Sequence, residues 1–241
     1  MFGRLAVSVL ALAALLSGGI ARADSLVLGG TYSSGIYMNG VIVSGSPVLD
    51  YPETGGSIGP STLNGISLAW VYCVDLYDNI VVPGTYSTTT VTYTGVITSE
   101  SASAAAANLS SGVVINAGEV AWLLGHYAAA ANTLGYDAQA ALQAAIWNVI
   151  YGVTASPAGS GSNDSTMIGY YNADLTALAL ACPTETACSA YISSVAWLSP
   201  GPGTDEQGLV TDGAVPEPAS LALLGTGLIG IVGLLRRKRP A

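Results

Sequence analysis

The stretch 137–152, DAQAALQAAIWNVIYG, predicts one helix, with an aspartate suited to the N-cap and a glycine to end it. One position in it is unusual. Gln143 shares a helix face with Ile146 and Trp147, which lie three and four residues further on. This places an uncharged amide on the apolar stripe. It is either a buried glutamine satisfied by backbone groups or a group that meets a specific partner across the interface.

The segment before it predicts a second helix. Asn116 followed by Glu119 resembles a capping box, with Asn in the Ser/Thr position. Apolar residues then recur at helical spacing until Gly135, which suits a C-terminal cap: Val120, Leu123, Leu124, Tyr127, Ala131 and Leu134. Because the link between the two helices is so short, we expect an antiparallel helical hairpin.

The N-terminal half predicts β structure. Residues 25–97 are rich in Val, Ile, Thr and Tyr, and three stretches read as strands: GIYMNGVIVSG (35–45), ISLAWVYCVDL (66–76) and GTYSTTTVTYTGVI (84–97). In the second stretch Cys73 falls on the face of Val71 and Asp75. The other face carries Ile66, Leu68, Trp70, Tyr72 and Val74.

Two further elements follow the hairpin. Apolar residues between Met167 and Leu178 indicate a third helix, and AYISSVAWL (190–198) reads as a strand that returns to the sheet. The order of elements excludes a βαβ alternation. The predicted fold class is therefore α+β: a β-rich barrel or sandwich with an inserted helical hairpin and a third helix.

Both ends of the chain read as export segments. Residues 1–23 carry a basic Arg4, an apolar run and a small-residue exit, ARA, which indicates a signal peptide cleaved after Ala23. Near the other end, the uncharged residues 219–235 would span about 25 Å as a helix, close to the roughly 30 Å of a bilayer core. We expect a single transmembrane helix there, with a cytoplasmic basic stop of Arg236, Arg237, Lys238 and Arg239.

These assignments divide the chain into four parts. They are the signal peptide (1–23), an exported domain (24–199), a linker (200–214) and a C-terminal segment (215–241). All six Lys and Arg lie in the two ends, whereas fourteen of the fifteen Asp and Glu lie between Asp24 and Val215. A surface so acidic excludes nucleic acid and anionic lipid as its partners. It also rules out cross-links that need lysine inside the domain.

No cofactor is expected. One histidine and one unpaired cysteine are too few for a transition-metal site. The acidic loops DLYDN (75–79) and SNDS (162–165) are too sparse for the EF-hand pattern, which leaves calcium open. His126 lies in the first helix of the hairpin, where it is either structural or able to assist proton transfer.

The three cysteines divide into two and one. Cys182 and Cys188 bracket a five-residue loop containing proline, so we expect a local disulfide between them. Cys73 is left over in an oxidising compartment, where an accessible thiol is a liability. Burial is the plainest explanation, since free cysteine is among the most buried residue types.

YC at 72–73, followed seventy residues later by LQAAIW at 142–147, resembles the paired motif of bacterial surface thioester domains. That family joins a cysteine of its β portion to a glutamine of its helical portion. The resemblance implies an internal thioester between Cys73 and Gln143. Its apolar frame would be Tyr72, Leu142, Ile146 and Trp147. Many Gram-positive members have threonine before the glutamine, where this chain has leucine.

The C-terminal segment resembles a second known family. Pro216, Glu217 and Pro218, then an apolar stretch and a basic cluster, occur in the order of the PEP-CTERM sorting signal of Gram-negative bacteria. The resemblance implies processing by an exosortase in the inner membrane. The chain would be anchored there first and then reach the cell surface or extracellular matrix.

Three functions fit these features. The leading hypothesis is a surface protein that acylates an amine or hydroxyl of a partner in a single turnover rather than as an enzyme, with matrix polysaccharide as one candidate partner. The second is a non-covalent structural protein of the exopolysaccharide matrix with a buried, free Cys73. The third, a Cys73–His126 hydrolase or transglutaminase, has no local motif behind it.

Overall fold

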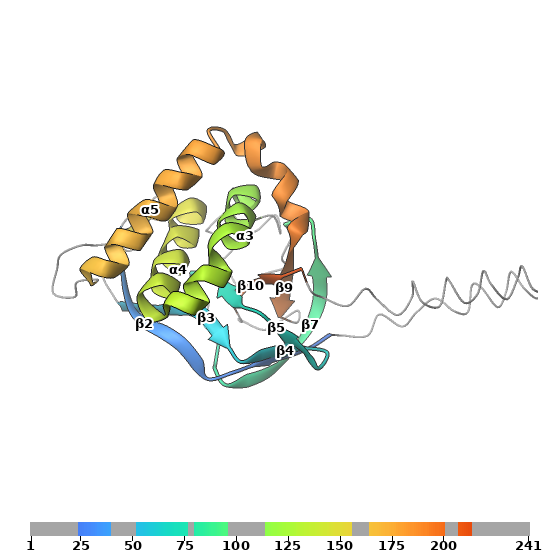
Figure 1. The fold of residues 1–241 in the computed structure, drawn as a ribbon. Coiled ribbons are helices and arrows are strands. Elements are labelled where there is room, and N and C mark those ends of the chain that lie inside the picture. The colour runs from blue at the N-terminus through green and yellow to red at the C-terminus, as the bar shows by residue number, and fades with distance from the viewer. Residues whose placement is uncertain are drawn as a thin grey trace, which may run out of the picture. The chain divides into compact units, whose positions relative to one another are not determined.

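The computed structural model describes residues 24–39, 52–76, 80–95, 114–155, 164–200 and 207–213. The expected signal peptide, the sorting motif at Pro216–Pro218 and the basic cluster at 236–239 lie outside these residues. The described chain forms one compact unit of helices packed on β-sheets, so the mixed helix-and-strand class is confirmed (Figure 1).

The strands form two sheets. The larger sheet has the order β5-β4-β1-β7-β9-β10-β6 and the smaller one the order β3-β2-β8. Each described neighbouring pair is antiparallel. The large sheet comprises β1 (Asp24–Leu28), β4 (Ser61–Leu63), β5 (Ile66–Leu68), β6 (Val71–Cys73), β7 (Gly84–Thr92), β9 (Val195–Pro200) and β10 (Leu209–Asp212); the small sheet comprises β2 (Thr31–Asn39), β3 (Pro52–Gly59) and β8 (Thr154–Ala155).

The stretch 66–76, predicted as one strand, is two. It divides at Ala69 and Trp70 into β5 and β6, which are the opposite edge strands of the large sheet. Two residues of chain span at most about 10 Å between the strand ends, so the sheet must curl until its edges approach there. Among the described strands β5 and β6 are not paired, so the first alternative of the predicted barrel or sandwich, a closed barrel, is wrong: the sheet curls but stays open.

The helical hairpin is confirmed. It consists of α3 (Ala117–Leu134) and α4 (Tyr136–Tyr151), which are separated by Gly135 alone. The Asn116 side chain at the start of α3 donates to the Val149 carbonyl near the end of α4 at 3.0 Å, as antiparallel neighbours allow. Helix α4 lies between α3, α5 and the β2–β3 layer, and most of its side chains are buried.

Asn116 is the N-cap residue of α3, as predicted, but neither predicted side-chain cap of the hairpin forms. Asn116 adopts a left-handed conformation (φ 55°) and gives its side chain to Val149 instead of to the helix start. Helix α4 begins one residue before Asp137, because Gly135 makes the whole turn with φ 98°. A turn this short leaves no residue for a side-chain cap. Gly152 ends α4 in the left-handed conformation (φ 72°), as predicted.

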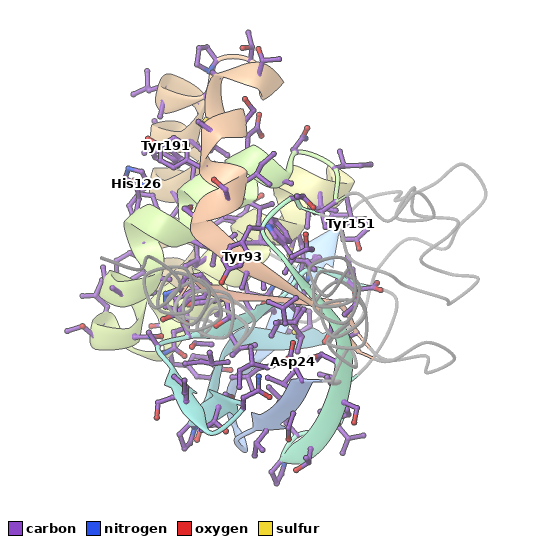
Figure 2. All side chains as sticks on the ribbon, turned by 90° about the vertical axis from the view of Figure 1, so that its right-hand side faces the viewer. Asp24, Tyr93, His126, Tyr151 and Tyr191 are labelled. Carbon is purple, nitrogen blue, oxygen red and sulfur yellow. A yellow bond between two sulfur atoms is a disulfide. The ribbon has the colours of Figure 1, made fainter. Side chains whose placement is uncertain are left out.

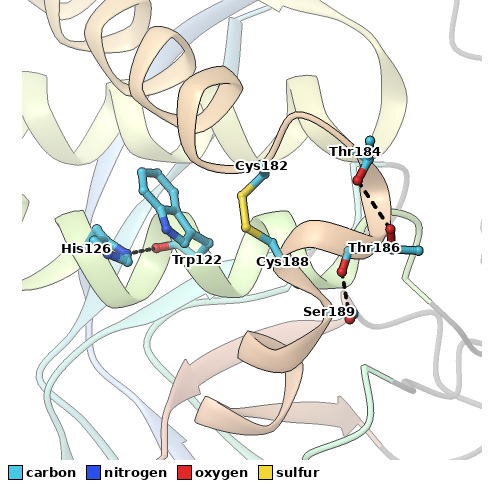
Figure 3. The surroundings of a disulfide bond; sticks show 7 residues. All are labelled: Trp122, His126, Cys182, Thr184, Thr186, Cys188 and Ser189. Atoms are coloured by element: carbon cyan, nitrogen blue, oxygen red, sulfur yellow. Dashed lines mark hydrogen bonds between the residues drawn. A yellow bond between two sulfur atoms is a disulfide. The ribbon is translucent and has the colours of Figure 1, made fainter.

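The third helix and the disulfide are also present. Helix α5 (Ser165–Ala181) begins at Asp164, whose side chain accepts from the Thr166 N–H at 2.7 Å. A bond between Cys182 and Cys188 then joins the end of α5 to a 3-10 helix, η2 (Glu185–Ser194) (Figure 3). The strand predicted at 190–198 therefore starts only at Val195, since the residues before it are helical.

Candidate functional site at Cys73 and Gln143

The Gln143 amide lies against the backbone of Cys73. Its Oε1 accepts from the N–H of Cys73 at 3.0 Å and from the N–H of Gly56 at 3.3 Å. Its Nε2 donates to the Cys73 carbonyl at 2.7 Å. Cys73 is 2% exposed and Gln143 is 0% exposed. The structure thus brings together the two residues that the sequence paired, and the amide on the apolar face of α4 has its partners.

The position of β6 at the sheet edge explains why these groups are available. Cys73 is paired with Leu209 of β10 on one side only. In an antiparallel ladder, alternate residues turn both the N–H and the C=O away from a given neighbour. At Cys73 both groups point away from β10, toward the open side of β6. In a wider sheet, a further strand would pair with them there. The side chain of Gln143 occupies that place and satisfies both groups.

Two glycines of β3 complete the site. Gly56 has φ 93°, a conformation that favours glycine, and directs its N–H at Gln143. At Gly55 an added Cβ would lie 2.4 Å from Cγ of Gln143 and 2.9 Å from Cη2 of Trp147. The Gln143 side chain therefore passes directly over the Gly55 backbone. The sequence prediction missed both residues. The available signal was a Gly-Gly pair in a region rich in β-branched residues.

The predicted apolar frame is buried. Leu142 and Ile146 are 0% exposed and Trp147 is 1% exposed, so α4 presents no open path to the amide along this face. Tyr72, the residue before Cys73 on β6, is also fully buried. Water is therefore kept from the Cys73–Gln143 contact by packing on both the helix and the strand sides.

The electrostatic surroundings keep the Cys73 thiol neutral. Burial raises its pKa far above the usual range, and the nearby Asp75 carboxylate raises it further. Asp75 is itself 0% exposed. A buried neutral thiol is protected from oxidation in an exported protein. It becomes a nucleophile only where a neighbouring group removes its proton.

His126 lies elsewhere. It is on the exposed surface of α3, with Nδ1 2.8 Å from the Trp122 carbonyl oxygen and its ring stacked on Trp122 at 4.1 Å (Figure 3). Its ring also faces Tyr191 at 5.8 Å. Figure 2 shows His126 and Tyr191 well separated from Tyr151, which contacts the chain just after Cys73. The proton-transfer role predicted for His126 stays a prediction with no contact to support it.

The two acidic loops lie only partly within the described residues. Asp164 caps α5, while Asp78, Asn79 and Asn163 lie outside the described residues. In the part of the chain that the structure describes, no three His, Cys, Asp or Glu side chains are grouped so as to hold a metal ion.

Comparison with known families agrees with this geometry. Residues 70–179 match the thioester domain family. The match includes Cys73, the helical hairpin with Gln143, and most of α5. A second family model, the PEP-CTERM protein-sorting motif, matches residues 214–239. No curated protein and no solved structure matches the chain. Both resemblances inferred from the residues are thus confirmed.

The sorting motif indicates how the protein is exported and processed. It implies an exported protein with a C-terminal membrane anchor that an exosortase, a membrane enzyme, processes. The segment expected to be that anchor, 219–235, lies outside the described residues. Among the described helices, none is both long enough and apolar enough for a membrane span.

Proposed function

We propose that this protein is carried to the cell surface or extracellular matrix and attaches there covalently to a partner through an internal thioester. The bond would join Sγ of Cys73 to Cδ of Gln143. One observation carries the proposal: Oε1 of Gln143 accepts two backbone N–H groups, one of them from Cys73 itself. An amide held in this way is both polarised and fixed against the backbone of the cysteine.

The two N–H groups have the arrangement of an oxyanion hole. Attack of sulfur on Cδ would move negative charge onto Oε1, where the N–H groups of Cys73 and Gly56 already point. In enzymes, one such donor contributes about 2.7–4 kcal/mol to the transition state. Holding the reactants together adds effective molarities of about 10⁵–10⁸ M. Both effects are needed, because an unactivated amide resists attack by a thiol in water.

Burial would then preserve the product. A thioester between a 2%-exposed cysteine and a 0%-exposed glutamine meets little water. The acyl group would be transferred once to an amine or hydroxyl of the partner, which leaves Gln143 bound to the partner and Cys73 as a free thiol. Because the domain does not regenerate, it acts as a covalent binding module and not as an enzyme. Matrix polysaccharide is a candidate source of the nucleophile.

The composition of the domain supports the same proposal. Between Asp24 and Val215 there is no lysine. An internal lysine amine within reach would consume the thioester before a partner arrived. The acidic surface also favours approach of a positively charged partner.

A non-covalent matrix protein is the second candidate, and a specific observation favours it. The Gln143 amide uses both its oxygen and its nitrogen in good hydrogen bonds. A glutamine serving only to satisfy the edge of β6 would have the same contacts. The hydrolase reading has no such support, because the described contacts of His126 are with aromatic neighbours and the Trp122 backbone.

The intact mass of the mature protein separates the two candidates. The thioester form lacks the mass of one ammonia, regains mass when methylamine is added, and then exposes one titratable thiol. Cys73→Ala should show the full mass and no response to methylamine. A wild-type protein with the unmodified mass would contradict the thioester, whether or not the buried Cys73 titrates in native buffer.

A further inference from the structure

Asp75 follows Cys73 by two residues, just beyond the end of β6. The Val74 N–H donates to the Gly208 carbonyl at 3.0 Å, which continues the pairing of β6 one residue beyond its end. On an extended backbone, residues two apart share a face. Cys73 and Asp75 are 2% and 0% exposed, so both side chains are buried.

The backbone around Asp75 is held from two directions. The Tyr151 hydroxyl donates to the Val74 carbonyl at 3.1 Å and accepts from the Leu76 N–H at 3.1 Å. Nε2 of Gln207 donates to the Asp75 carbonyl. Tyr151 belongs to α4, two turns after Gln143. One helix therefore fixes both the amide beside Cys73 and the peptide groups on either side of Asp75.

A carboxylate carried by this fixed backbone is useful here because the Cys73 thiol does not ionise by itself. Its pKa is raised by burial and by the Asp75 charge, so a free thiolate is disfavoured at neutral pH. Transfer of the proton to the carboxylate avoids that cost, because the total charge of the pair is unchanged. His126 lies on the exposed surface of α3, where its described contacts include Trp122 and Tyr191.

We propose that Asp75 is the group that carries the proton in the reaction between Cys73 and Gln143, an inference that rests on the proposed thioester. In formation, the Asp75 carboxylate takes the Sγ proton as sulfur attacks Cδ. The tetrahedral oxyanion is held by the N–H groups of Cys73 and Gly56. The C–N bond then breaks, the Asp75 proton passes to the leaving nitrogen, and ammonia departs. A thiol and an amide become a thioester and ammonia, with Asp75 regenerated.

Opening by an amine follows the same path in reverse. The amine nitrogen attacks Cδ and gives a proton to the Asp75 carboxylate. The C–S bond breaks, and the proton returns to sulfur. Asp75 thus affects both the formation of the thioester and its transfer to a partner.

The test uses Asp75→Asn, which keeps the size of the side chain but removes its basicity. Formation is followed after synthesis by the loss of ammonia from the intact mass. We expect the variant to form the thioester about 10²–10⁴-fold more slowly than the wild type, the range of general acid–base catalysis. Asp75→Glu should recover part of that rate. Asp174→Asn, which removes another buried carboxylate, should form the thioester at the wild-type rate.

A second measurement needs no variant. Opening of the wild-type thioester by methylamine should be slower in D₂O, because a proton moves in the step. Absence of that isotope effect, or wild-type formation rates in Asp75→Asn, would overturn the role of Asp75 and leave the thioester intact. A wild-type protein that never loses ammonia would instead overturn the proposed function itself.

Discussion

The molecule holds its cysteines in two regions that treat the same side chain in opposite ways. Cys182 and Cys188 are six residues apart and join α5 to η2 through a covalent bond that needs no other side chain. Cys73 has no second cysteine and lies against an amide carried by a helix seventy residues away. The first region depends on spacing in the chain. The second depends on how α4, β3 and β6 pack, so the addition of a single methyl group there should disturb it far more.

The largest effect should come from Gly55→Ala. The new methyl group would lie 2.4 Å from Cγ of Gln143, so β3 or α4 must move. We expect a loss of about 3 kcal/mol in the free energy of unfolding, the upper end of the range for overpacking, with no thioester formed, while the disulfide remains. Urea unfolding and intact mass measure the two effects.

Gly169→Ala is the matched control for that substitution. Gly169 lies in α5, and an added Cβ would meet nothing within 4 Å. This change should stabilise the protein by about 0.5–1 kcal/mol, as alanine does in a helix. If Gly55→Ala were equally harmless, the tight passage of Gln143 over β3 would be refuted.

Removing the disulfide should have a smaller effect on stability and should leave the contact between Cys73 and Gln143 in place. Replacing Cys182 and Cys188 by alanine frees a loop closed over a sequence separation of six residues. The chain-entropy relation gives a loss of about 2 kcal/mol in unfolding free energy. Thermal unfolding should show this loss, whereas intact mass should still show the thioester. A simultaneous loss of the thioester would mean that the two regions are coupled.

The smallest effect concerns Asp174, which lies on α5 yet acts electrostatically on Tyr72, the neighbour of Cys73. Burial raises the pKa of Asp174 from 3.8 to about 7. Between these values the folded protein binds a proton that the unfolded chain has lost. This contribution to stability therefore falls as pH rises from about 4 to about 7.

Asp174→Asn should remove that dependence. At pH 8 the variant should exceed the wild type by about 1 kcal/mol, after allowance for solvent screening, and the advantage should vanish below pH 4. Urea unfolding at several pH values measures it. A constant difference between the two proteins across this range would show that Asp174 does not titrate in the window.

The sequence predicted the two reacting residues of the candidate site but not the two glycines of β3 that pack against them. Gln143 was conspicuous because it interrupts an apolar face, and Cys73 because it has no partner. Gly55 and Gly56 carried no comparable signal, since the chain has thirty glycines and most suit turns equally well. What makes them special is the approach of α4, which only the tertiary structure contains.

The same limit explains the errors in the fold. Alternation runs without interruption through Ala69 and Trp70, so it could not reveal that β5 and β6 belong to opposite edges of the sheet. At 190–198 the apolar spacing fits a strand, but the first residues follow the disulfide-linked turn into η2. There the chain packs so closely on α3 that a Cβ at Gly118 would lie 2.5 Å from the Cys188 carbonyl oxygen. Local patterns describe faces, whereas these outcomes depend on neighbours distant in sequence.

The position of β10 determines how the domain would respond to tension. It is the last described strand before the sorting motif, and it lies between β9 and β6 rather than at an edge. Its hydrogen bonds run across the strand direction on both sides. A pull along β10 from the C-terminal side therefore loads two ladders in shear, and their bonds must fail together instead of one by one. Since β6 carries Cys73, such a pull would reach the strand of Cys73 directly.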